Sequence, residues 1–326
     1  MISRNDYDPK AYDPTFQWAF LAPKYWGTWF IVLLMFPVSL LPISFHHALA
    51  NFFARRLSKS QKGPAHRARV NFHLAFPEKS FAEREQLIYQ TLYTAGVFIL
   101  RFGLLTVRSK EWLQTQCRFE GEEHLTKHLD NGDNVILLVP HSWAIDIPAV
   151  FLASKGLPVS AMAKRQKNEV SDWLMHRQRV QYGGRVYERS GGIKPFIKSI
   201  KSGYLGYYLP DQDHGPELSE FVDFFATKKA TLPGITKLSK LSKAKVIPLF
   251  ASIDQKTGQY VLELQSVLEW QDTESEDARQ MNRVIETFVK SKPEQYMWIL
   301  RLFNSQQDGR RVYRDAIKKY DNDWKV

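Results

Sequence analysis

Between residues 117 and 252 the chain alternates short apolar runs with stretches of helical period, and this alternation constrains its fold more than any other feature. The run NVILLVP, residues 134–140, is continuously apolar, which is typical of a strand buried on both faces. Strands that alternate with helices predict an α/β fold with a largely parallel central sheet flanked by helices. We expect strands over residues 117–121, 134–140, 157–164, 185–189, 204–210, 221–225 and 245–252.

Helical signals lie on either side of this region. Ser80 and Glu83 have the spacing of a capping box, and apolar residues then recur at helical period to about Leu105. Residues 275–320 are expected to be mainly helical.

The N-terminal part contains an uncharged apolar segment, residues 25–45. It is just long enough to cross a bilayer core of about 30 Å. The cations that follow, at residues 55–62, would then place the rest of the chain in the cytoplasm. Pro37 and Pro42 would either kink a spanning helix or split it, so that it dips into one leaflet. We therefore predict an N-terminal tail and membrane anchor over residues 1–57.

Two other interpretations of this segment remain open: a buried helical hairpin, and a signal peptide. A signal peptide fits less well, because the region before the segment is long and carries Asp6, Asp8 and Asp13. Residues 58–69 are polar and basic, which is typical of a hinge, and we predict a catalytic domain over residues 58–326.

The composition limits the kinds of binding partner that we expect. A formal net charge of +11 favours an acidic partner, such as nucleic acid, an anionic membrane or an acidic protein. The cations are spread along the chain and no zinc-finger or RNP1-type motif occurs, so we expect no nucleic-acid binding. Cys117 is the only cysteine, which excludes an internal disulfide and a multi-cysteine zinc site and is compatible with the cytosol.

The residues that most resemble catalytic groups are His141 and Asp146. His141 directly follows the apolar run 134–140, and open α/β sheets place their sites at the carboxyl ends of their strands. In this hypothesis Asp146, in the first turns of the next helix, accepts the Nδ1–H of His141 and leaves Nε2 free to take a proton from a hydroxyl. The spacing alone is not specific, and a strand-end histidine bonded to a neighbouring backbone group is the alternative.

Other chemistries lack sequence support. No G-x-S-x-G, H-E-x-x-H, Walker A or G-x-G-x-x-G motif occurs, so we expect no metal and no cofactor.

Several blocks in the same order resemble the late acyltransferases of lipid A biosynthesis, a family of lauroyl and myristoyl transferases. The resemblance covers nearly the whole chain. It implies a glycerolipid-acyltransferase-like fold, an acyl carrier protein thioester as the donor, and an acyl-chain hydroxyl of a lipid A precursor as the acceptor. It also fits a place at the bacterial inner membrane, with the catalytic domain on the cytoplasmic side. The matching blocks are residues 69–85, 134–149, 207–215, 221–240, 245–250 and 292–303.

Within that resemblance we assign candidate substrate-binding residues. Lys164, Arg165 and Arg189 follow expected strands and would hold a lipid phosphate, although solvated surface cations are the simpler interpretation. Asp211 and Asp213 would contact the substrate sugar or form a turn.

A cluster of lysines would form a docking face for the acidic carrier protein, or else a solvated surface. It comprises Lys228, Lys229, Lys237, Lys240, Lys243 and Lys245.

Two alternative functions remain open. A lysophospholipid or glycerol-phosphate acyltransferase would use the same residue pair on a different hydroxyl. A non-catalytic membrane lipid-binding protein would keep the fold without depending on His141.

Overall fold

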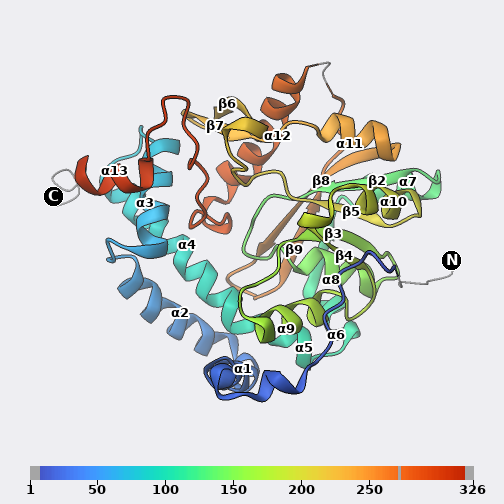
Figure 1. Cartoon of the computed structure of the whole chain (residues 1–326). Helices are drawn as coiled ribbons and strands as arrows, with labels where there is room; N and C mark the ends of the chain where they lie inside the picture. Colours follow the sequence, from blue (N-terminus) through green and yellow to red (C-terminus); the bar gives the residue numbers. More distant parts are fainter. Residues whose placement is uncertain (1–7, 271–272, 320–326) are drawn as a thin grey trace.

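A largely parallel sheet forms the centre of the protein, as the sequence predicts (Figure 1). The computed structural model describes residues 8–270 and 273–319. Within these residues the sheet has seven strands, of which β2, β3, β4, β5 and β8 run parallel; β9 is antiparallel to β8, and β1 is parallel to β9. In spatial order the strands are β1 (Cys117–Glu120), β9 (Tyr260–Leu264), β8 (Ala244–Ile253), β2 (Asn134–Leu138), β5 (Leu205–Tyr208), β3 (Val159–Ala163) and β4 (Arg185–Glu188).

The structure confirms the strand predicted at residues 221–225 but not its place in the sheet, and it contains two further strands that the sequence did not indicate. Residues 221–225 do not join the sheet, because β6 (Glu220–Phe224) pairs with β7 (Thr227–Thr231) in a separate antiparallel hairpin. Strand β7 was missed because two of the five residues in its sequence TKKAT are lysines, and β9 was also missed.

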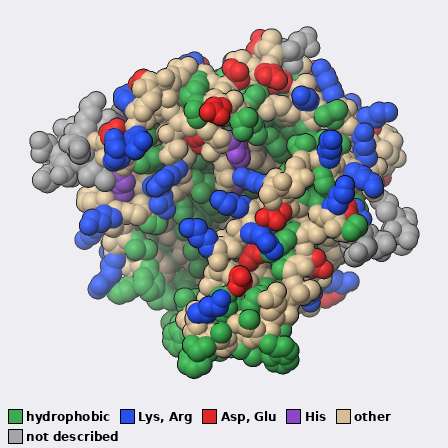
Figure 2. Space-filling model, in the orientation of Figure 1, with side chains coloured by type: hydrophobic (Ala, Val, Ile, Leu, Met, Phe, Trp, Pro, Cys, Tyr) green, Lys and Arg blue, Asp and Glu red, His purple; other side chains and the backbone are tan. Residues whose placement is uncertain are grey.

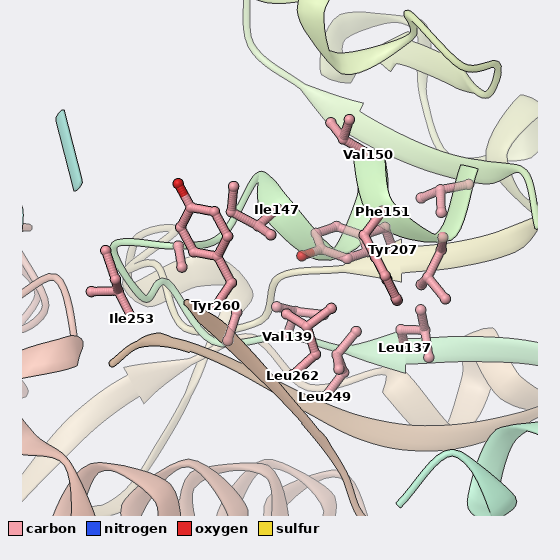
Figure 3. Close-up of a cluster of buried hydrophobic side chains, with 14 of the residues drawn as sticks. Leu137, Val139, Ile147, Val150, Phe151, Tyr207, Leu249, Ile253, Tyr260 and Leu262 are labelled. Carbon is pink, nitrogen blue, oxygen red and sulfur yellow. The ribbon is translucent and has the colours of Figure 1, made fainter. Parts of the chain in front are cut away.

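The central strand β2 shows why the sheet needs helices on both faces. Ile136 and Leu138 face the layer formed by α10, α11 and α12, whereas Val135 and Leu137 face α4 and α8. Figure 3 shows Leu137 in the second of these clusters, together with Val150 and Phe151 of α8. All four side chains are almost completely buried. The helices that complete these layers are α6 (Lys110–Gln116), α7 (Glu123–Asp130), α8 (Ile147–Ser154), α9 (Glu169–Arg179), α10 (Lys194–Lys201), α11 (Ile235–Ser242) and α12 (Glu274–Ser291).

A second layer of helices lies beside the sheet (Figure 1). Its long helix α4 (Phe81–Phe102) begins at the predicted capping box, in which Ser80 accepts from Glu83 N and the Glu83 carboxylate accepts from Ser80 N. A short α5 (Leu104–Val107) follows. Helix α2 (Ile43–Leu57) crosses α4 closely: a Cβ on Gly96 would lie 3.0 Å from Ala50 Cβ.

The apolar N-terminal segment is split into two helices. Helix α1 (Trp26–Ser39) ends before Pro42, and α2 begins after it. Pro42 has no N–H to donate to the Val38 carbonyl, and the buried His46 Nε2 contacts this oxygen instead, at 2.8 Å. A helix of 14 residues is about 21 Å long, which is shorter than a bilayer core of about 30 Å.

One helical stretch among the described residues, Phe81–Val107, has the length and composition of a membrane span. Its most apolar window is 56% buried inside the protein, because α2 and α3 (Gly63–Ala75) pack on it. We therefore interpret α4 as a core helix.

The C-terminal part is mainly helical, as the sequence predicts, but an irregular segment divides its helices. After α12 and the short 3-10 turn Pro293–Gln295, residues 296–311 run without a regular helix to α13 (Val312–Lys319). This irregular segment is nevertheless part of the core, because Tyr296, Trp298 and Phe303 are fully buried. Asn71 of α3 donates to the carbonyls of Trp298 and Leu300, at 2.6 and 2.8 Å.

We predict that Asn71→Leu destabilises the protein by about 3 kcal/mol, because it leaves the buried Trp298 carbonyl and the partly buried Leu300 carbonyl without this donor. Thermal unfolding followed by tryptophan fluorescence measures the change. The exposed Asn304 provides the control, and Asn304→Leu should change the stability by less than about 0.5 kcal/mol. Equal effects of the two substitutions would contradict this role of Asn71.

Candidate active site

The carboxyl ends of the parallel strands meet at one edge of the sheet, and the candidate residues gather there. His141 follows β2, and Asp211 follows β5. Strands β2 and β5 are neighbours in the sheet, with Leu138 opposite Tyr208. The two loops therefore leave the sheet side by side.

His141 is bound to Asp211 by two hydrogen bonds. Its Nδ1 lies 2.5 Å from Asp211 Oδ1, and its backbone N–H donates to Asp211 Oδ2 at 2.7 Å. The Asp211 side chain is completely buried, whereas the His141 side chain is 12% exposed. Burial alone would raise the pKa of Asp211, but the His141 ring and its two hydrogen bonds, together with Lys229, hold this pKa below its usual value. An ionised Asp211 keeps the proton of His141 on Nδ1 and leaves Nε2 as the acceptor.

The predicted hydrogen bond between His141 and Asp146 is not formed. Asp146 instead accepts from Arg179 of α9, whose Nε lies 2.8 Å from Oδ1. The physical reason is local: residues 143–146 form a turn, helix α8 begins only at Ile147, and Tyr207 OH donates to the Ile145 carbonyl at 2.6 Å. The negative charge of Asp146 raises the pKa of Arg179 against the effect of burial.

The turn that carries His141 is fixed by the irregular C-terminal segment. Met297 N donates to the His141 carbonyl at 2.8 Å, and Trp143 N donates to the Gln295 carbonyl at 2.9 Å. Ser142 and Tyr296 form an antiparallel bridge. Chain segments more than 150 residues apart in sequence thus hold the histidine in place.

Asp213, by contrast, has a structural role. Its carboxylate accepts from Ser305 N and Ser305 Oγ, at 2.6 and 2.8 Å, and from Gly215 N at 3.0 Å. Of the two roles that the sequence left open for Asp211 and Asp213, the contacts fit the structural one. Asp211 is buried behind His141, and the carboxylate of Asp213 accepts from protein donors.

Lys229 lies inside the protein, where its positive charge interacts with the negative charges of Asp211 and Asp213. Its side chain is fully buried, and its Nζ donates to the Ala230 carbonyl at 3.3 Å. Burial lowers the pKa of Lys229 to about 8, although Asp211 and Asp213 act to raise it. The sequence suggested that Lys229 lies on an exposed docking face. This prediction is wrong, because the side chain is buried.

The predicted phosphate-binding cations lie along the same edge of the sheet as His141. Lys164 and Arg165 directly follow β3, and Arg189 follows β4. Arg165 lies over the Tyr12 ring, with its Nε 3.9 Å from Glu188, and both terminal nitrogens of Arg189 lie 3.4 Å from Gln212 Oε1. Among residues 8–270 and 273–319, no carboxylate oxygen lies within 4.0 Å of the side-chain nitrogens of Lys164 or Arg189.

Gln212 is a site residue that the sequence did not indicate. Its Nε2 lies 3.0 Å from Nε2 of His141. In the described part of the chain, no group of three or more His, Cys, Asp or Glu side chains is arranged to hold a metal ion. The site therefore consists of one histidine, a buried carboxylate behind it, and amide and cationic groups in front. Such a pair of histidine and carboxylate can accept a proton from a hydroxyl at Nε2.

Comparisons with known proteins agree with the sequence resemblance. The profile of the bacterial lipid A biosynthesis acyltransferase family matches residues 13–305. The chain is 43% identical over 304 residues to a lipid A biosynthesis myristoyltransferase of Escherichia coli K12, covering 91% of this chain and 93% of that protein. It is 38% identical over 303 residues to a lipid A biosynthesis acyltransferase of Haemophilus influenzae, covering 93% and 95%. A lipid A biosynthesis lauroyltransferase of Escherichia coli K12 is 26% identical over 299 residues, covering 91% and 97%.

These matches identify the protein as an acyltransferase, and the fold and the site agree with this. The chain belongs to the bacterial lipid A biosynthesis acyltransferase family. The alternative of a non-catalytic lipid-binding protein is therefore set aside.

We predict that the proton of neutral His141 resides on Nδ1 because Asp211 accepts it. Asp211→Asn should abolish this preference and give a mixture of tautomers, whereas Asp146→Asn should leave the tautomer unchanged, since Asp146 contacts Arg179. Nitrogen-15 NMR of labelled histidine distinguishes the two tautomers. A tautomer that depends on Asp146 and not on Asp211 would contradict the geometry described above.

Proposed function

We propose that the protein transfers a lauroyl or myristoyl chain from an acyl carrier protein thioester to an acyl-chain hydroxyl of a lipid A precursor. The observation that carries this proposal is the contact of His141 Nδ1 with the buried Asp211, in a chain of this family. The 43% identity to the myristoyltransferase, against 26% to the lauroyltransferase, favours a 14-carbon chain as the first donor to test.

In this mechanism His141 acts as the general base. Its Nε2 takes the proton from the acceptor hydroxyl, and the hydroxyl oxygen attacks the thioester carbonyl carbon. The tetrahedral intermediate collapses, so that an ester bond forms and the C–S bond breaks. The proton on Nε2 then passes to the departing thiolate, and Asp211 stabilises the transient imidazolium by its negative charge.

The cations at the carboxyl edge would bind the anionic parts of the two substrates. Three of them directly follow β3 or β4: Lys164, Arg165 and Arg189. Arg189 contacts Gln212, which in turn contacts His141. Lys243 and Lys245, by contrast, lie at the start of β8, at the opposite edge of the parallel strands. We therefore place the acyl carrier protein near the carboxyl edge, and not on the lysines around α11.

We test the reaction by incubating the detergent-purified protein with lauroyl- and myristoyl-acyl carrier protein and an under-acylated lipid A precursor. Mass spectrometry should show a gain of one acyl chain. His141→Ala should lower the rate by about 10³-fold, because it removes the base. His128→Ala serves as the control, since His128 lies in α7 and bonds to Asp133. Acyl transfer that survives His141→Ala would contradict the assigned base, and transfer to a lysophospholipid alone would favour that alternative acceptor.

We further propose that α1 and α2 attach the protein to the inner membrane without spanning it, with the catalytic part on the cytoplasmic side. Large apolar side chains are exposed along both helices, with Phe30 at 69% and Leu33 at 66% exposed. Figure 2 shows hydrophobic side chains gathered at the lower end of the molecule, where Figure 1 places α1. Monomeric soluble proteins rarely expose so many contiguous apolar side chains. The other exposed members are Trp26, Ile31, Leu34, Leu40, Leu41, Phe45, Phe52, Phe53 and Leu57.

Cations next to these helices suit an anionic leaflet. Arg55 and Arg56 lie in the last turn of α2, and Lys59 and Lys62 follow it. Each cation near an anionic bilayer surface adds about 1 kcal/mol of attraction. Helix α1 has 14 residues, which are too few to cross the bilayer. Its length and the neighbouring cations therefore favour a pair of helices that lies in the membrane interface.

We predict that Phe30→Ser with Leu33→Ser lowers partitioning onto phosphatidylethanolamine–phosphatidylglycerol vesicles by at least about 10-fold, since each side chain loses apolar burial in the lipid. Vesicle flotation measures the bound fraction. Leu241→Ser, at an exposed leucine of α11, should have no effect. Loss of binding in the α11 variant, or retention in the α1 double variant, would place the membrane contact elsewhere.

A further inference from the structure

The side chain of Gln212 lies between His141 and Arg189 and contacts both. Its Nε2 is 3.0 Å from Nε2 of His141, and its Oε1 is 3.4 Å from both terminal nitrogens of Arg189. Gln212 is half-buried and follows Asp211 directly, so one short loop supplies both the carboxylate behind the histidine and the amide in front of it.

The direction of these hydrogen bonds is fixed from both ends. Arg189 carries only donors, so the Gln212 group that faces it must be the amide oxygen. His141 gives its Nδ1 proton to Asp211, so its Nε2 accepts, and the Gln212 group that faces it must be the NH₂. Gln212 therefore presents an N–H donor at the nitrogen that must later take the proton of the substrate.

Three backbone N–H groups that could stabilise a developing oxyanion already donate to other acceptors. Backbone N–H groups after the catalytic histidine are natural candidates. His141 N, however, donates to Asp211, Ser142 N donates to the Pro140 carbonyl at 2.7 Å, and Trp143 N donates to the Gln295 carbonyl at 2.9 Å. These three backbone N–H groups are therefore engaged, and the amide of Gln212 is a side-chain donor that lies close to Nε2 of His141.

We propose that Gln212 is a catalytic residue that supplies this donor. In the free enzyme its amide covers Nε2 of His141. The acceptor hydroxyl displaces the amide from Nε2, and the NH₂ then donates to the carbonyl oxygen of the thioester as negative charge develops there. Arg189 acts as a positioning residue, because it holds Oε1 and keeps the NH₂ directed into the site. The proposal rests on the proposed acyl transfer.

The test compares steady-state kinetics of three variants at Gln212 with the wild type. Gln212→Leu removes the donor at similar size, and we expect kcat to fall about 10²- to 10³-fold while KM for the acceptor changes only a few-fold. Gln212→Glu keeps the contact with Arg189 but has no donor, so it should lose at least as much. Gln212→Asn keeps a shorter amide and should recover part of the rate. Gln86→Leu, at an exposed glutamine of α4, is the matched control.

Each other outcome overturns the proposal. An unchanged or higher kcat in Gln212→Leu would mean that the amide only covers the resting histidine. A rise in KM without loss of kcat would mean that Gln212 binds the acceptor.

An inactive wild type would contradict the proposed reaction and, with it, the oxyanion role. The resting contact is then measured separately: Gln212→Leu should shift the Nε2 resonance of His141 in nitrogen-15 NMR, and an unchanged resonance would exclude that contact as well. Melting temperatures near that of the wild type show that the variants are folded.

Discussion

The hydrogen-bonded pair of His141 and the buried Asp211 is the interaction on which the rest of the site depends. A buried carboxylate is costly unless donors and opposite charge surround it, and here His141 supplies two hydrogen bonds while Lys229 supplies charge from inside. The pair exists only because β2 and β5 are adjacent in the sheet, so that the loops after them meet. The same contacts fix the tautomer of His141, direct Nε2 outward and place Gln212 in front of it.

Helix α4 connects this site to the face that we assign to the membrane. At Gly96 it packs against Ala50 of α2, one of the two helices with exposed apolar side chains. One turn and a half earlier, Thr91 of α4 donates to the Tyr296 carbonyl at 3.1 Å and accepts from Trp143 Nε1 at 3.2 Å. Tyr296 and Trp143 flank the backbone contacts that hold His141. In the proposed membrane arrangement, helix α4 would set the distance between the bilayer and His141, which suits an acceptor anchored in the membrane.

The sequence predicted the parts of the fold that local pattern determines. The continuous apolar run before His141 became the central strand β2, and Ser80 and Glu83 formed the capping box of α4. The sequence also singled out His141 as a candidate, and the structure places it after strand β2, in contact with Asp211 and Gln212. It failed on the partner of His141, since Asp146 is close in sequence but Asp211 is close in space, and only the strand order β2-β5-β3-β4 brings Asp211 there. The burial of Lys229 and the position of Gln212 between His141 and Arg189 likewise depend on contacts between distant segments, which charge and spacing in one sequence do not reveal.

We propose that His141 and Asp211 act as one catalytic unit, and a double-mutant cycle on kcat/KM tests this most directly. The cycle combines His141→Ala with Asp211→Asn, and a parallel cycle combines His141→Ala with Asp146→Asn. If Asp211 acts only through the histidine, adding Asp211→Asn to His141→Ala should cost almost nothing further, as residues that act as a unit are not additive. In the parallel cycle the effect of Asp146→Asn should be nearly the same with and without His141. Independent effects of His141 and Asp211, with coupling between His141 and Asp146 instead, would contradict the account.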